Sequence, residues 1–107
     1  MKQISRDNLL ARKRCRGYYQ VGDSYCPIGA VMAEFLGRDN LGIIQYDCFF
    51  DCPDDVMILL TSIASCNPDG LKRYFASWES TMVDGWINTL GVLLYDMENY
   101  GLIQVTD

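Results

Sequence analysis

The stretch from Ser24 to Gly37, SYCPIGAVMAEFLG, constrains the fold more than any other part of the sequence. Pro27 suits the first position of a helix, and Gly37 suits the position just after its end. Between them, apolar side chains recur at steps of three and four residues, which is the spacing of a helix with one broad buried face. Small residues such as Gly29 leave room for another helix to approach closely. We therefore predict a buried central helix over residues 27–36.

Similar signals divide the rest of the chain. Ser5 is a candidate helix cap, and the first helix is predicted to run from it to Gly17. The acidic residues after Pro53 favour the start of another helix, which Asn67-Pro68 would end. The remaining predicted elements are a short helix over residues 71–78, a helix from Thr81 to Gly101 with Thr81 and Asp84 as its capping box, and a terminal strand over residues 102–105.

Together these elements predict a mainly α (α+β) fold. We expect a compact bundle of four to five helices, with a short hairpin or extended segment near residues 18–25 where aromatic and β-branched residues flank Gly22-Asp23. A chain of 107 residues has the size of one domain, so residues 1–107 are predicted to form a single globular unit.

The apolar stretches of the sequence are short. None approaches the ~20 residues that a membrane-spanning helix needs. The basic start of the chain lacks the apolar segment of a secretory signal. We therefore expect a cytoplasmic chain with no membrane partner. The sequence leaves open whether it is a monomer or a dimer.

Charge is unevenly distributed along the sequence. Residues 1–17 hold six Lys and Arg residues against one Asp, whereas the remaining ninety residues hold three against thirteen Asp and Glu residues. Such asymmetry is typical of a basic arm or an acidic binding surface. Two alternatives stay open for the basic residues: they lie against the acids of their own domain, or they bind elsewhere. The members of this basic arm are Arg12, Lys13, Arg14 and Arg16.

The acidic part of the chain is the candidate partner-binding surface. An acidic surface attracts a basic surface on a partner protein and speeds the encounter. The sequence pI of ≈ 4.5 is opposite to the basic character of most nucleic-acid-binding domains, so we do not expect nucleic acid as a partner. The candidate partner-binding residues are Asp47, Asp51, Asp54, Asp55, Asp96 and Glu98.

The five cysteines do not predict a reaction. Their odd number and irregular spacing argue against a disulfide framework, and the chain contains no histidine to complete a zinc site or to activate a thiol. Cys26 stands at a helix start, where a thiol pKa can be lowered, but free cysteines are more often buried core residues. We therefore interpret Cys26 as structural and predict no catalytic residue, no metal and no cofactor.

The aromatic residues near the end of the chain fall at helical spacing. Trp78, Trp86, Tyr95 and Tyr100 are therefore predicted to lie mostly in the core. Any of them left exposed would suit an interface, where tyrosine and tryptophan often act as anchors.

The run Tyr25-Cys26-Pro27-Ile28-Gly29-Ala30, preceded by Tyr19-Gln20, resembles a motif of small uncharacterised bacterial and bacteriophage proteins. In those proteins a cysteine, an apolar residue and Gly-Ala open a buried helix after a short polar hairpin. The segment Ser77-Trp78-Glu79 before the last helix is also similar, although Glu79-Ser80 stands where Asn-Asp is usual. The resemblance covers about a third of the chain and implies a phage or mobile-element setting.

These observations lead to three hypotheses about function. The leading one is a non-enzymatic interaction protein that binds and inhibits a host macromolecule, such as a defence or nucleic-acid-handling complex, as anti-CRISPR and anti-restriction proteins do. The second is an immunity or antitoxin protein that neutralises a cognate toxin. The third, which the sequence favours least, is a thiol- or metal-dependent enzyme.

Overall fold

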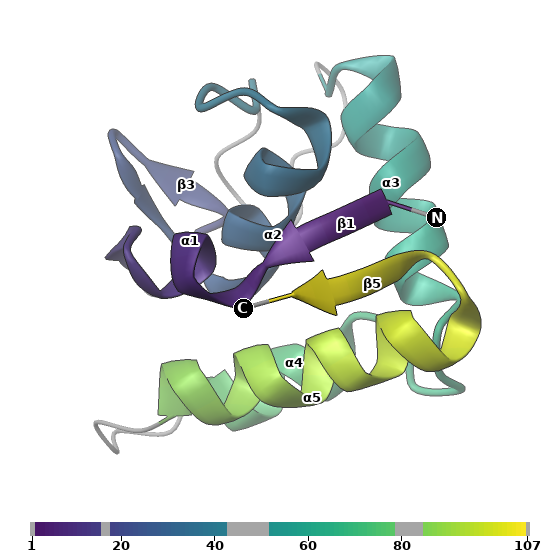
Figure 1. Cartoon of the computed structure of the whole chain (residues 1–107). Helices are drawn as coiled ribbons and strands as arrows, with labels where there is room; N and C mark the ends of the chain where they lie inside the picture. Colours follow the sequence, from purple (N-terminus) through teal and green to yellow (C-terminus); the bar gives the residue numbers. More distant parts are fainter. Residues whose placement is uncertain (1, 16–17, 43–51, 79–84, 107) are drawn as a thin grey trace.

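The computed structural model describes residues 2–15, 18–42, 52–78 and 85–106 of the chain. Within these residues the structure has five helices and five strands, and four of the helices follow one another between β4 and β5 (Figure 1). In order, they are β1 (Lys2–Ser5), α1 (Arg6–Leu10), β2 (Lys13–Arg14), β3 (Gln20–Val21), β4 (Ser24–Tyr25), α2 (Pro27–Leu36), α3 (Asp54–Ala64), α4 (Lys72–Trp78), α5 (Gly85–Tyr100) and β5 (Ile103–Thr106).

This arrangement is an α+β fold, and the prediction of a mainly α bundle is wrong. Two small sheets accompany the helices: β1 pairs with β5, and β2, β4 and β3 form a second sheet in that order. The β1–β5 pair is parallel and in register from Lys2 opposite Ile103 to Ser5 opposite Thr106. Figure 1 shows these two strands between α2 and α5, with the two ends of the chain meeting in one sheet. A pairing over such a separation leaves no local pattern in the sequence.

The central helix is confirmed over the predicted residues. α2 contacts α1, α3, α5, β1 and β4, and its first seven residues are buried. Gly37 follows it in the left-handed conformation, with φ of 69°, as expected of a glycine that ends a helix. Gly29 faces the backbone of Tyr19, not another helix: a Cβ added there would overlap with the Tyr19 carbonyl group. The small side chain thus lets α2 pack directly against the chain that enters β3.

The first helix is shorter than predicted. Its cap is confirmed, because the Ser5 side chain accepts a hydrogen bond from the backbone N–H of Asn8. However, α1 ends at Leu10, and the chain then turns into β2, which pairs with β4 in parallel. The backbone N–H of Cys15 donates to the carbonyl of Tyr25 at 3.0 Å. Pairing with a neighbouring strand therefore satisfies backbone groups that the predicted helix would have used.

The later helices and the last strand are confirmed, with different end points. α3 begins directly after Pro53, α4 covers the predicted short helix, and β5 is the predicted terminal strand. α5 is described from Gly85, so the capping box of Thr81 and Asp84 lies outside the described residues. The hairpin is also confirmed: β3 and β4 pair antiparallel around Gly22, whose φ is 60°.

Helical spacing predicts more buried side chains than the structure has. Trp86 is buried and donates its indole N–H to the carbonyl of Tyr25 at 3.0 Å. Tyr95 and Tyr100, which were also predicted to lie in the core, are exposed, as are the apolar side chains of Ile58 and Ile87. The side chain of Trp78 lies outside the described part of the structure. In the described ranges, no helix combines the length and apolar character needed to cross a bilayer.

Candidate functional site

A cleft of about 640 Å³ lies beside the β3–β4 hairpin and the segment that follows α2. Side chains from distant parts of the sequence meet there because the hairpin and this segment both pack near the start of β2. Its lining residues are Arg12, Gln20, Gly22, Asp23, Tyr25, Asp39, Asn40 and Gly42.

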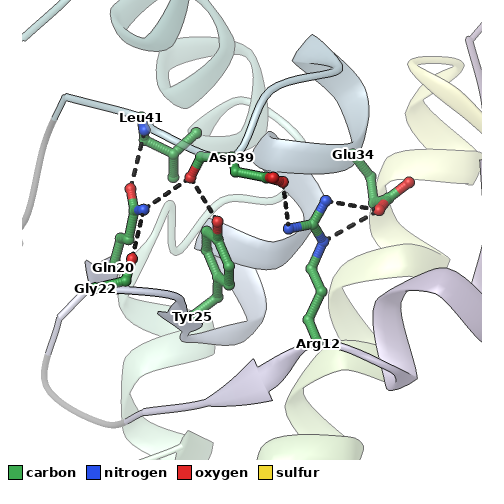
Figure 2. A network of polar contacts seen from close by, with 7 residues as sticks. All are labelled: Arg12, Gln20, Gly22, Tyr25, Glu34, Asp39 and Leu41. Carbon is green, nitrogen blue, oxygen red and sulfur yellow. Dashed lines mark hydrogen bonds and ion pairs between the residues drawn. The ribbon is translucent and has the colours of Figure 1, made fainter.

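Two side chains of the hairpin, Gln20 and Tyr25, form hydrogen bonds with the segment after α2. Gln20 and Tyr25 are directly opposite each other in the β3–β4 pair, so their side chains lie on the same face of the sheet. The Gln20 amide N–H₂ donates to the carbonyl of Asp39 at 2.7 Å, and its oxygen accepts from the backbone N–H of Leu41 at 2.9 Å. The Tyr25 hydroxyl donates to the same Asp39 carbonyl (Figure 2). Three hydrogen bonds therefore fix the backbone of this segment on the hairpin.

Arg12 joins the segment to α2. Its guanidinium donates to Glu34 Oε1 from Nε at 3.1 Å and from Nη2 at 2.8 Å, and to Asp39 Oδ1 from Nη1 at 3.2 Å (Figure 2). It also lies over the Tyr25 ring, 4.9 Å from the ring centroid. Burial by itself would lower the pKa of Arg12, but its hydrogen bonds with Glu34 and Asp39 outweigh this effect and raise the pKa.

Two carboxylates already balance the charge of Arg12. Arg12 therefore holds residues of the cleft in place, and its guanidinium is not left unpaired for a ligand. Its side chain is 17% exposed, so this ion pair is partly withdrawn from water. The Asp39 side chain, by contrast, is 87% exposed. The Asp39 carboxylate is thus accessible to solvent or to a partner, although the Asp39 backbone is held in place by hydrogen bonds.

Asp23, between β3 and β4, also lines the cleft. Its carboxylate pairs with the Lys13 ammonium at 2.8 Å, and both side chains are more than two-thirds exposed. The hydrogen bond with Lys13 lowers the pKa of Asp23, so this carboxylate stays charged at neutral pH. An exposed pair of this kind adds little to the stability of the fold. Either side chain can therefore leave the pair and contact another charged molecule instead.

The start of α3 lies close to the same cleft. A Cβ added to Gly42 would come within 2.9 Å of the Pro53 side chain, so Gly42 and the residue before α3 are neighbours. Arg38 Nη2 also pairs with Asp55 Oδ1 at 2.9 Å. Two of the predicted partner-binding acids, Asp54 and Asp55, thus follow directly after a neighbour of the cleft residue Gly42. Both are exposed.

The other predicted acids do not join this group. Asp47 and Asp51 lie outside the described residues. Glu98 is exposed near the end of α5 and accepts a hydrogen bond from the backbone N–H of Val105 at 3.2 Å. Asp96 is only 7% exposed, which corrects its assignment to a partner-binding surface.

Asp96 belongs to an internal cluster that attaches α4 to α5. Its Oδ2 accepts from Arg73 Nε at 2.9 Å and from the Tyr74 hydroxyl at 3.0 Å. Tyr74 is fully buried, and its hydroxyl accepts from the Asn67 side-chain amide at 2.8 Å. Burial and the hydrogen bond to Asp96 raise the pKa of Tyr74, which therefore stays neutral. Helical spacing placed Asp96 beside exposed positions, but contact with α4 encloses it.

The basic arm lies on its own domain where the structure describes it. Arg12 and Lys13 pair with acids of the body, and Arg14 lies over the Trp86 ring at 5.0 Å from its centroid. Arg16 is outside the described residues. The described residues contain eight Lys and Arg residues and nine Asp and Glu residues, a net charge of −1. Most of the acidic excess of the whole chain, −5, therefore comes from residues that the structure does not describe.

Cys26 is a core residue, as predicted. It is fully buried at the start of α2, and its sulfur accepts a hydrogen bond from the backbone N–H of Gly29 at 3.3 Å. Burial raises the pKa of Cys15, and burial followed by repulsion from Asp96 raises that of Cys66 to about 11. Burial likewise raises the pKa of Cys52. These three thiols are protonated at neutral pH and are poor nucleophiles.

Among the described residues, no three His, Cys, Asp or Glu side chains are grouped as metal ligands. Comparison with protein-family models, with curated proteins and with solved structures found no match for this chain. The resemblance to small bacterial and phage proteins therefore stays a prediction.

Few signals in the sequence indicate the residues that build the cleft. Gln20 and Tyr25 fell in the predicted hairpin, but their use as hydrogen-bond donors depends on which segment packs against it. Asp39 was one acid among many. Its neighbours Arg38 and Asn40 are polar, so the local pattern resembled an ordinary exposed connection.

Proposed function

We propose that this chain is a non-enzymatic interaction protein that binds a partner protein through an acidic rim, defined as Asp23, Asp39, Asp54 and Asp55. The observation that carries the proposal is that the exposed acids Asp23 and Asp39 line one cleft. The exposed Asp54 and Asp55 follow Pro53, which is a neighbour of the cleft residue Gly42. The cleft backbone is held by hydrogen bonds that leave the carboxylate of Asp39 exposed. A pre-arranged acidic surface suits a partner that presents Lys and Arg side chains.

Asp47 and Asp51 extend this proposal. In sequence they lie between Gly42, which lines the cleft, and Pro53, which precedes α3. We expect neutralising them to weaken binding as well. Glu98 lies at another place in the fold and is not part of the acidic rim.

The proposed setting follows from the motif resemblance described above. It is a phage or mobile-element protein that acts in the cytoplasm and blocks a host defence or nucleic-acid-handling complex by covering its basic groove. Nucleic acid itself is not the proposed partner, because the acidic rim would repel phosphates.

The first test compares two variants with the same change in net charge. Asp39→Asn with Asp54→Asn removes two acids of the rim, and Asp7→Asn with Asp69→Asn removes two exposed acids that have no ion pair among the described residues. Tagged wild type and both variants are expressed in bacteria, and bound proteins are identified at about 0.05 M and about 0.5 M salt. We expect the wild type and the Asp7/Asp69 variant to capture the same partner at low salt. The Asp39/Asp54 variant should not capture it.

Equal capture by both double variants, or capture that is unchanged at high salt, would contradict the acidic-rim proposal. If a partner is captured, its identity distinguishes an inhibitor of a host complex from an immunity or antitoxin protein. Restored phage growth in a host that carries a defence system would support an inhibitor, whereas protection against one toxin would support an immunity or antitoxin role.

A further inference from the structure

The two acids that line the cleft already hold basic side chains of the same chain. Asp23 Oδ2 pairs with Lys13 Nζ at 2.8 Å, and Asp39 Oδ1 pairs with Arg12 Nη1 at 3.2 Å. The two bases are consecutive in the sequence, where the chain enters β2. The domain therefore places two cationic groups of its own on carboxylates that the acidic rim would present to a partner.

The contact between Lys13 and Asp23 is a consequence of strand pairing. Lys13 lies opposite Ser24 in the parallel β2–β4 pair, and Asp23 precedes Ser24 in the chain. The side chains of Lys13 and Asp23 nevertheless stay 72% and 74% exposed. Water solvates both charged groups when an exposed pair separates, so such a pair contributes little to stability. Lys13 can therefore leave Asp23 for solvent without disturbing the strands.

Arg12 is held differently, because a second carboxylate binds it more closely. Glu34 Oε1 accepts two hydrogen bonds, from Nε at 3.1 Å and from Nη2 at 2.8 Å, whereas Asp39 Oδ1 accepts one, from Nη1 at 3.2 Å (Figure 2). The Glu34 side chain is 19% exposed, and that of Asp39 is 87% exposed. If another cation binds the Asp39 carboxylate, Arg12 keeps both bonds with Glu34 and is not left unpaired.

We propose that Arg12 and Lys13 are internal occupants of the cleft, which a basic segment of the partner protein displaces from Asp39 and Asp23. This inference rests on the proposed function, because it states which contacts the acidic rim exchanges when a partner binds. Arginine suits the exchange best, since its planar guanidinium can bind one carboxylate through two parallel N–H groups. Lys13 competes with such a segment and lowers the affinity of the cleft for it.

The first test measures this competition with a defined probe, a peptide with blocked ends in which glycines flank an Arg-Arg pair. Its affinity is obtained from the NMR shifts of the backbone amides of residues 23 and 39–42, at about 0.15 M salt, where the Debye length is about 8 Å. Lys13→Ala is compared with Lys72→Ala, which removes the same charge from an exposed position of α4 that does not line the cleft. Lys72 has no ion pair among the described residues.

We expect Lys13→Ala to bind the peptide about twofold to fivefold more tightly than Lys72→Ala, which is the strength of an exposed ion pair. The difference should disappear when both substitutions are repeated in Asp23→Asn, because Lys13 then has no carboxylate to hold there. A second measurement follows the Arg12 Nε–H signal, which reports the bond with Glu34. This signal should stay in place when the peptide binds.

The possible failures differ from those of the acidic-rim proposal. Equal affinities of Lys13→Ala and Lys72→Ala, or a difference that persists in Asp23→Asn, would overturn the exchange at Asp23 and leave the rim as a binding surface. Loss of the Arg12 Nε–H signal on binding would overturn the exchange at Asp39. A peptide that shifts no amide of the cleft, or whose affinity is unchanged by Asp39→Asn, would contradict the acidic rim itself and this inference with it.

Discussion

The packing of α2 against the chain entering β3 makes one substitution especially informative. Gly29→Ala would place a Cβ 2.9 Å from the carbonyl carbon of Tyr19 and closer still to its oxygen. Ordinary contacts begin near 3.4 Å, and the contact with the oxygen falls short of this by more than an ångström, so the backbone must move by at least that much. The same carbonyl accepts from the backbone N–H of Cys26 at 3.3 Å. Neither partner is a flexible side chain that could turn away.

The expected loss of stability follows from three contributions. Overpacking in a close-packed core costs about 1–3 kcal/mol. Weakening the Cys26–Tyr19 hydrogen bond costs about 1 kcal/mol, and the better helix propensity of alanine offsets this by about 1 kcal/mol. We therefore expect Gly29→Ala to lower the free energy of unfolding by about 1–3 kcal/mol, and the Tm of a domain of this size by at least about 4 °C.

Urea and thermal unfolding, followed by circular dichroism in dilute solution, measure this effect. Gly91→Ala is the matched control, because it is the same substitution in another helix with open space around the new methyl group. It should raise stability by up to about 1 kcal/mol. If Gly29→Ala were as stable as the wild type, α2 would not pack against Tyr19 as described.

Three further substitutions test the cleft and the buried thiol. Arg12→Ala should lower the free energy of unfolding by about 1–3 kcal/mol because it leaves the partly buried Glu34 carboxylate unpaired, whereas Lys13→Ala, at an exposed pair, should cause no measurable change in urea unfolding. Tyr25→Phe removes a hydrogen bond to the Asp39 carbonyl, worth about 1 kcal/mol, and should speed hydrogen exchange in residues 38–42; unchanged exchange would contradict this role. The pKa of Cys66 is raised from 9.0 to about 11, so the folded state holds a proton that the unfolded chain releases, and stability should fall as pH rises from 9 to 11. Cys66→Ser should reduce this decline in urea titrations; an identical decline would assign it to other groups.

Much of the secondary structure could be predicted from the sequence because its signals are local. Pro27 and Gly37 delimit α2, Ser5 caps α1, and Gly22 marks the turn of the hairpin. Each signal depends on the conformations that one residue and its near neighbours can adopt. The candidate site was less accessible: Asp54 and Asp55 were identified, but the cleft was not.

Tertiary structure decided which elements pair and which side chains remain in water. β1 and β5 form a sheet, and β2 replaces the second half of the predicted first helix, because strand partners from elsewhere in the chain complete their hydrogen bonds. Asp96 became internal when α4 packed against α5, whereas Tyr95 beside it stayed exposed. By itself, the sequence determined where helices can begin and end, since those preferences act within one or two turns. The sheets, the cleft and the exposure of the apolar side chains on α5 depend on contacts between distant residues, which no local pattern encodes.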